Sequence, residues 1–141
     1  KALAGQWAQA ARMLCAERKL LFSCAVDALP ESMSLDTGMA AQAVENLLSN
    51  AVRFAKQTVR MRVYASGHTL CVQVDNDGPP FTPAQLERAA LARYTSGGGE
   101  HFGLGLYVST ILCEKHGGEL TVSNTETGHA RTAVSFRELL Q

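Results

Sequence analysis

The sequence has no excess of charge of either sign. Thirteen Lys and Arg residues balance thirteen Asp and Glu residues, so the formal net charge at pH 7 is zero. Proteins that hold nucleic acid or an anionic membrane through their overall field carry a strongly basic surface. We therefore expect no nucleic-acid partner, and any anion that binds has to be held by local geometry.

Long apolar runs and paired cysteines are also missing. No run approaches the roughly 18 apolar residues that a membrane-spanning helix needs, and no signal-type segment opens the chain. The cysteines, Cys15, Cys24, Cys71 and Cys113, form no CxxC pair and no zinc-type cluster with histidine. These absences predict a soluble, cytoplasmic domain with free thiols.

Length and turn residues are what the sequence does have. It holds 141 residues, of which 46% are hydrophobic and twelve are glycine, so it can bury a core of ordinary size and make many turns. It starts at Lys1, without a methionine and inside a helical pattern. We expect a single domain over 1–141 that is a fragment of a longer protein.

The spacing of apolar residues predicts the elements. Helical spacing predicts helices over 1–18, from Asp36 or Thr37 to about 55, from Pro83 to about 92, and from Leu104 to the glycine pair 117–118. A short apolar run predicts a buried strand over 20–26, and alternation predicts hairpins over 59–74 and 120–136. This order favours an α+β fold, a two-layer α/β sandwich whose mixed, mostly antiparallel sheet is covered on one face by helices.

A polar stripe runs along the second predicted helix. Asn46, Asn50 and Arg53 lie one turn apart, displaced from the apolar stripe. Two carboxamide oxygens and a guanidinium in this arrangement can share a hydrated Mg²⁺ and a polyphosphate. A solvated helix face explains the same pattern, because surface helices usually carry one.

The end of the second strand of the first hairpin carries Asn76-Asp77-Gly78-Pro79. A polar side chain before a glycine can present an acceptor to an adenine amino group, since the missing Cβ lets the base approach the backbone. An ordinary Asp-Gly-Pro turn is the alternative.

A glycine-rich stretch over 97–106 leads into the last predicted helix. Its backbone N–H groups can cradle phosphates, helped by the positive end of the helix dipole. It lacks the Gly-Lys-Ser/Thr of a P-loop and the βαβ unit of a dinucleotide fold, and a flexible linker is the alternative.

These motifs together resemble those of sensor histidine kinases. Glu45 to Phe54 resembles the N box, Asn76 to Pro79 the G1 box and Gly103 to Leu106 the G2 box, and the likeness spans nearly the whole chain. It implies the catalytic and ATP-binding domain of a two-component kinase. The implied fold is the Bergerat-type fold shared with gyrase-type ATPases, heat-shock protein 90 and mismatch-repair ATPases.

The resemblance implies a role for each matching residue. Asn50 would ligate Mg²⁺, Asn46 would support the metal and the phosphates, and Arg53 would reach a phosphate; Glu45 or Asn46 would orient the acceptor imidazole. Further contacts to ATP or ADP would come from Phe54, Asn76, Gly78, Arg93, Tyr94, Gly103, Leu104, Gly105, Leu106 and Thr132. The stretch 81–102 would be the ATP lid.

Asn76 stands where the family usually has an aspartate that binds the adenine amino group. An amide oxygen can still accept from that amino group, without the strength of a charge-assisted bond. We therefore expect a lower affinity for the nucleotide.

The phosphoacceptor is the part that the sequence does not contain. None of the four histidines is followed by the acid and basic residue usual for an acceptor. We expect the acceptor on an upstream dimerisation domain of a homodimeric, membrane-anchored sensor that passes phosphate to a response regulator. The alternatives are an anti-sigma-factor-type serine kinase and a degenerate nucleotide-binding or protein-interaction module.

Overall fold

The computed structural model describes residues 2–27, 29–30, 33–92 and 104–138. Its elements in chain order are α1 (Ala2–Glu17), β1 (Leu21–Val26), α2 (Thr37–Phe54), β2 (Thr58–Ser66), β3 (Thr69–Asn76), α3 (Pro83–Ala92), α4 (Leu104–Lys115), β4 (Leu120–Asn124) and β5 (Ala130–Arg137). None of the helices in the described ranges is long and apolar enough to cross a bilayer.

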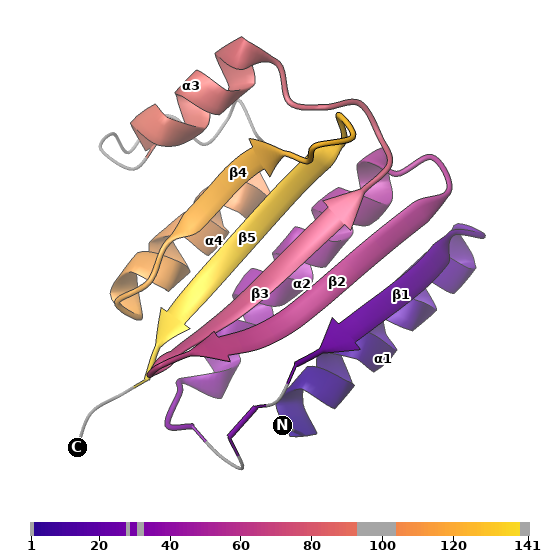
Figure 1. Cartoon of the computed structure of the whole chain (residues 1–141). Helices are drawn as coiled ribbons and strands as arrows, with labels where there is room; N and C mark the ends of the chain where they lie inside the picture. The colour runs from indigo at the N-terminus through magenta and orange to yellow at the C-terminus, as the bar shows by residue number, and fades with distance from the viewer. Residues whose placement is uncertain (1, 28, 31–32, 93–103, 139–141) are drawn as a thin grey trace.

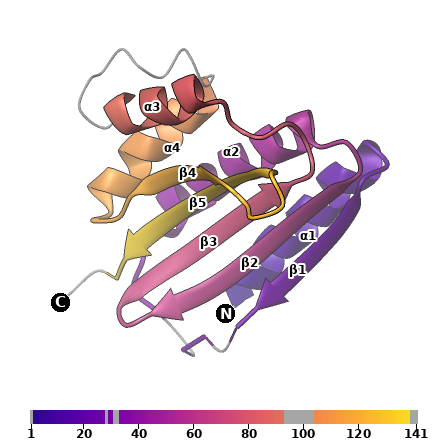
Figure 2. The same cartoon turned by 45° about the horizontal axis from the view of Figure 1, so that its top comes forward.

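The strands form one five-stranded sheet in the order β1-β2-β3-β5-β4. β1 runs parallel to β2, and the other neighbours pair antiparallel. The helices α1, α2 and α4 cover one face of the sheet and leave the other face open, while α3 lies beyond the end of β4 (Figures 1 and 2). The predicted α+β fold, with a mixed, mostly antiparallel sheet covered on one face by helices, is confirmed.

Alternation along the central strands explains why only one face is covered. In β3 and β5 every second residue is buried, which places Val72, Val74, Val134 and Phe136 against the helices. The residues between them are polar or half-exposed and form the open face. A strand with this pattern stabilises a sheet with one apolar and one solvated face.

The central helix, α2, follows its predicted pattern. It begins after Asp36, whose side chain accepts a hydrogen bond from the Met39 N–H at 3.1 Å. The apolar stripe predicted from spacing is buried, and Val44, Leu47 and Leu48 are at most 1% exposed. Truncating one of these leucines to alanine would cost about 2–5 kcal/mol, so the stripe fixes which face of α2 remains for other contacts.

The strand β1 differs from its prediction. The apolar run was predicted to be buried, but β1 is an edge strand in which Leu21 is 71% exposed and Val26 48% exposed. It pairs only with β2, and α1 covers only one of its faces. Hydrophobicity alone does not reveal whether a strand has neighbours on both sides.

The C-terminal end of α4 is followed, as predicted, by a glycine in the left-handed conformation. Gly117 has φ of +71°, and the Gly118 N–H donates to the Cys113 carbonyl at 2.8 Å. The preceding residue, His116, is buried and joins two other elements: its Nε2 accepts from the Asp36 N–H at 2.8 Å, and its Nδ1 donates to the Arg137 carbonyl at 3.2 Å. This pattern is that of a neutral ring with its hydrogen on Nδ1.

Candidate functional site

The end of the sheet at which β3 terminates brings together most of the predicted site residues. The last turns of α2 and the turn after β3 meet there (Figure 1). Three residues on α2 keep to the predicted polar stripe, because Asn46 and Asn50 are half-buried and Arg53 is exposed. Neither asparagine side chain has a hydrogen-bond partner among the described residues, so both carboxamides are available to a ligand.

The last two residues of α2 are held at the surface. The Arg53 guanidinium lies 5.4 Å from the centre of the Phe54 ring, a cation–π distance, and Phe54 is 50% exposed. Glu45, on the same helix, is also exposed. An exposed aromatic ring beside a cation fits a surface that meets a planar or phosphorylated ligand.

Gly78 joins the turn after β3 to the end of α2. A Cβ built on Gly78 would lie 2.2 Å from the Phe54 carbonyl oxygen and 2.8 Å from Asn76 Oδ1. The end of α2 occupies the direction in which a Cβ would point, and the predicted contact of Gly78 with an adenine ring stays a prediction. The glycine therefore serves close packing of two backbone segments, which no other residue allows here.

Asp77 reinforces this junction. Its carboxylate accepts hydrogen bonds from the backbone N–H groups of Lys56, Gln57 and Thr58 at 2.8 to 3.1 Å. Desolvation raises the pKa of the Asp77 carboxyl, but these N–H groups outweigh that effect and hold the pKa below its usual value. Sequence reasoning did not single out this residue, because its partners lie about twenty positions away.

Asn76 is buried, at 7% exposure, on the helix-covered side of the sheet. Its Oδ1 accepts a hydrogen bond from the Gly78 N–H at 2.9 Å. The oxygen that was predicted to meet an adenine amino group is therefore already engaged once. Thr132 lies on the neighbouring strand β5 opposite Val74 and is also buried, with its Oγ1 3.5 Å from the Val74 carbonyl.

The start of α4 lies beside the polar stripe of α2. His116 bonds to Asp36, and the Ser109 hydroxyl donates to the Ala43 carbonyl at 3.1 Å, so the two segments run antiparallel. Ala43 is seven residues after Asp36 and Ser109 seven before His116, and the same register, extended by five residues along each helix, would bring the start of α4 level with Leu48. The Leu104-Gly105-Leu106 backbone thus begins a helix at the level of Asn46 and Asn50.

Three predicted contacts, Arg93, Tyr94 and Gly103, lie outside the described residues, as does the second part of the predicted lid, 93–102. The segment that leads into α3 is described and is held by Asn124, at the end of β4. Asn124 Oδ1 accepts from the Phe81 N–H at 2.7 Å, and Asn124 Nδ2 donates to the Phe81 carbonyl at 2.9 Å. A sequence pattern could not reveal this clamp, since its two residues are 43 positions apart.

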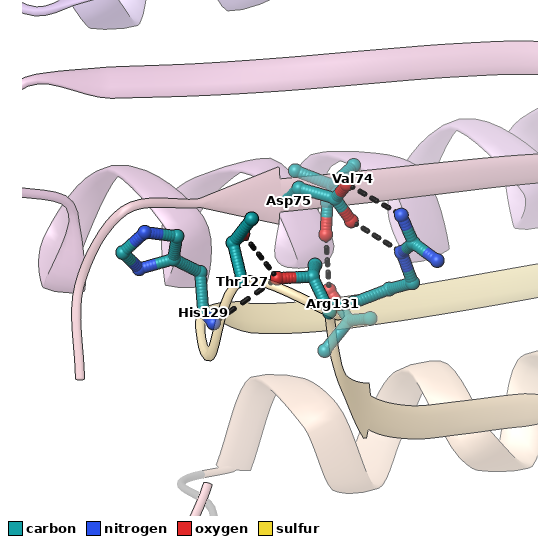
Figure 3. Close-up of polar contacts among 7 residues, drawn as sticks. Val74, Asp75, Thr127, His129 and Arg131 are labelled. Atoms are coloured by element: carbon teal, nitrogen blue, oxygen red, sulfur yellow. Dashed lines mark hydrogen bonds and ion pairs between the residues drawn. The ribbon is translucent and has the colours of Figure 1, made fainter. Parts of the chain in front are cut away.

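The open face of the sheet carries a hollow of about 560 Å³ at the same end, and Asn76 and Asp77 are among the residues that line it. On it, Arg131 donates to both carboxylate oxygens of Asp75 at 2.8 and 2.9 Å, and the turn over Thr127 and His129 forms one wall (Figure 3). The hydrogen bond to Asp75 raises the pKa of Arg131. Because the two charges neutralise each other, the hollow offers no free cation from this pair.

In the part of the chain that the structure describes, no group of three or more His, Cys, Asp or Glu side chains is placed to hold a metal ion. The four cysteines are free, with Cys15 and Cys113 buried. A divalent cation at this site would need its ligands from amide oxygens, water and the bound molecule itself.

Comparison with known proteins identifies relatives of the chain. A family described as histidine kinase-, DNA gyrase B-, and HSP90-like ATPase matches residues 36–140. Sensor protein PfeS of Pseudomonas aeruginosa is 38% identical over 92 residues, which cover 62% of this chain and 21% of PfeS. Sensor protein RstB of Escherichia coli is 31% identical over 110 residues, which cover 73% of this chain and 25% of RstB. The chain thus spans about a quarter or less of these relatives.

Solved structures show the same fold. The catalytic domain of histidine kinase ThkA superposes with a TM-score of 0.79 at 18% identity, covering 99% of this chain and 94% of that one. Full-length ShkA in complex with AMPPNP gives a TM-score of 0.79 at 23% identity, covering 99% of this chain and 30% of ShkA. At these identities the likeness concerns the fold.

Proposed function

The chain belongs to the histidine kinase-, DNA gyrase B- and HSP90-like ATPase family, and from this premise we propose that it is the ATP-binding catalytic domain of a two-component sensor histidine kinase. The observation that carries the proposal is the junction at Gly78, which holds the turn after β3 against the end of the Asn46–Asn50 helix. A nucleotide bound beside this junction, on the helix-covered side of the sheet, would meet polar groups from both segments.

Each residue at this end of the sheet has a role in the proposal. Asn46 and Asn50 would face the phosphates, Arg53 would neutralise phosphate charge, and Asn76 would face the base. Phe54, Thr132 and the start of α4 would complete the walls, and Glu45 or Asn46 would orient the acceptor imidazole. Transfer of the γ-phosphate would then depend mainly on positioning and charge neutralisation.

Magnesium fits this site in one particular way. The Asn50 carboxamide oxygen is a hard ligand without a partner among the described residues, and no carboxylate cluster competes with it there. Asn50 would supply one oxygen, with water and phosphate oxygens supplying the rest. Bound in this way, the ion would neutralise phosphate charge during transfer.

The acceptor would come from outside the described residues. His116 is buried with both ring nitrogens bonded, His68 Nδ1 is bonded to Glu138 at 2.9 Å, and His129 is half-buried in a hairpin turn. We infer that an upstream dimerisation domain of a homodimeric, membrane-anchored sensor supplies the histidine and that a cytoplasmic response regulator receives the phosphate.

Calorimetric titration with Mg-ATP tests the metal and phosphate assignment. We expect micromolar-to-millimolar binding, and a roughly ten-fold loss of affinity in Asn50→Ala because a metal ligand is removed. Ser49→Ala, an exposed neighbour on α2, is the matched control and should bind as the wild type does. Absence of binding in the wild type, or equal affinity in Asn50→Ala, would overturn the assignment.

A further inference from the structure

The end of β3 and the turn after it offer three side chains that can hydrogen-bond a purine base, and the structure separates them. Asp75 lies on the open face of the sheet with both carboxylate oxygens bound by Arg131 (Figure 3). The Asp77 carboxylate is occupied by three backbone N–H groups. Asn76 alone lies on the helix-covered side, where the proposed nucleotide would bind.

The orientation of the Asn76 carboxamide follows from its one hydrogen bond. The Gly78 N–H is a donor, and the only acceptor in the Asn76 carboxamide is its oxygen. Oδ1 therefore lies toward Gly78, and Nδ2 points away from it. Among the described residues, Trp7 Nε1 is the one fully buried side-chain nitrogen or oxygen without a partner. Asn76 Nδ2, which has no partner there either, is therefore reachable from the surface.

Rotating the carboxamide is disfavoured by the same contact. A flip would set Nδ2 against the Gly78 N–H, two donors facing each other, and would leave a buried backbone N–H unpaired. The close approach of Gly78 to the Phe54 carbonyl prevents the turn from moving to relieve this conflict. The available part of Asn76 is thus a hydrogen-bond donor, with at most one lone pair left on Oδ1.

This donor changes which base the position suits. An aspartate offers only acceptors, which match the 6-amino group of adenine. The Asn76 amide instead offers two hydrogens, which match the acceptor O6 of hypoxanthine or guanine. We propose, on the basis of the proposed nucleotide-binding function, that this site accepts a 6-oxopurine nucleoside triphosphate at least as tightly as ATP.

The pair ATP and ITP provides the test, because the two nucleotides share ribose and triphosphate and differ at position 6 of the purine and in the hydrogen on N1. Titration calorimetry with magnesium should give a dissociation constant for ITP equal to or below that for ATP. In Asn76→Asp the ratio should shift toward ATP by roughly ten-fold, since a site that hydrogen-bonds one group rejects the analogue that leaves its own groups unpaired.

Asp75→Asn is the matched control. It makes the reverse carboxylate–amide exchange one residue away, on the open face of the sheet, and should leave the ratio of ITP to ATP affinity unchanged. Circular dichroism on each variant establishes that the fold is retained.

The outcomes separate this inference from the proposed function. Binding of ATP by the wild type that is measurably tighter than binding of ITP would overturn the inference while leaving the proposed function in place. An unchanged ratio in Asn76→Asp would also overturn it, because the base would then not meet Asn76. Failure of both nucleotides to bind would overturn the proposed function and the inference together.

Discussion

At the scale of single residues, the candidate site depends on contacts between backbone and side chain at one turn. Asp77 accepts three N–H groups from the α2–β2 connection, and Gly78 lies against the last carbonyl of α2. Hydrogen bonds to a charged group are among the stronger ones in proteins. The turn after β3 is thereby held in one conformation before any ligand binds.

Gly78→Ala tests this junction. We expect the free energy of unfolding to fall by roughly 1–3 kcal/mol, because the new Cβ would lie 2.2 Å from the Phe54 oxygen and force two backbones apart. The matched control is Gly5→Ala in α1, where nothing lies within 4 Å of the new Cβ. Its free energy of unfolding should rise by about 0.5–1 kcal/mol, because alanine loses less backbone freedom than glycine when a helix forms.

Urea unfolding followed by the fluorescence of Trp7, the single tryptophan of the chain, measures both variants. Trp7 is a residue of α1 whose side chain is buried in the core, at 4% exposure, so its emission reports loss of packing. If Gly78→Ala unfolds at the same urea concentration as the wild type, the close packing does not constrain the turn.

At the scale of elements, hydrogen bonds between distant parts of the chain set how helices meet the sheet. His116 ties the start of α2 to the ends of α4 and β5. Asn124 ties the segment before α3 to β4, and α3 itself begins with a reciprocal cap in which Thr82 and Gln85 bond each other's N–H groups. The position of α3 therefore depends on one asparagine at the end of a strand.

Asn124→Ala should loosen α3 selectively. Loss of both bonds to Phe81 should speed hydrogen exchange at the amides of α3 by roughly ten-fold, while exchange in β3 and β5 stays unchanged. Ser123→Ala, an exposed residue on the same strand, is the control and should leave α3 unaltered. Exchange read by mass spectrometry resolves the two regions, and equal protection of α3 in all three proteins would show that the clamp is dispensable.

At the scale of the whole molecule, the described chain has a two-layer fold in which helices pack on one face of a five-stranded sheet. The predicted resemblance to sensor histidine kinases is confirmed by the family match over residues 36–140. Yet the chain spans only 21% of PfeS and 25% of RstB. In the proposed function, this part of such a protein binds the nucleotide and another part supplies the acceptor.

The isolated chain should therefore not phosphorylate itself. Incubation with γ-labelled ATP and magnesium is expected to leave the protein unlabelled. His116 has both ring nitrogens bonded, His68 lies in the β2–β3 turn at the opposite end of β3 from Asn76, and His129 lines the hollow on the open face of the sheet. Calorimetry in the same buffer is the control, since it shows that nucleotide is bound while no transfer occurs. An acid-labile, base-stable label on the chain would mean that one of its histidines is an acceptor.

The sequence by itself determined the parts that depend on short-range spacing. The apolar stripe of α2 and the alternation of β3 and β5 repeat every few residues, so the elements and the one-sided sheet could be predicted. The Asn46, Asn50 and Arg53 stripe follows from the same helical period, and the three motifs identified the family. β1 was wrongly predicted as buried because burial depends on neighbours that spacing does not describe.

Only the tertiary structure decided which polar atoms remain free for a ligand. The Asp77, Asn124 and His116 contacts join residues about 20, 43 and 80 positions apart, and no local pattern encodes such pairs. The hydrogen bond from the Gly78 N–H to Asn76 Oδ1 spans only two positions. It fixes the Asn76 carboxamide because the Phe54 carbonyl, at the end of α2, packs against Gly78 and holds the turn in place. Donors and acceptors are engaged by whatever the fold brings within about 3 Å, so the chemistry that Asn76 offers is a property of the folded chain.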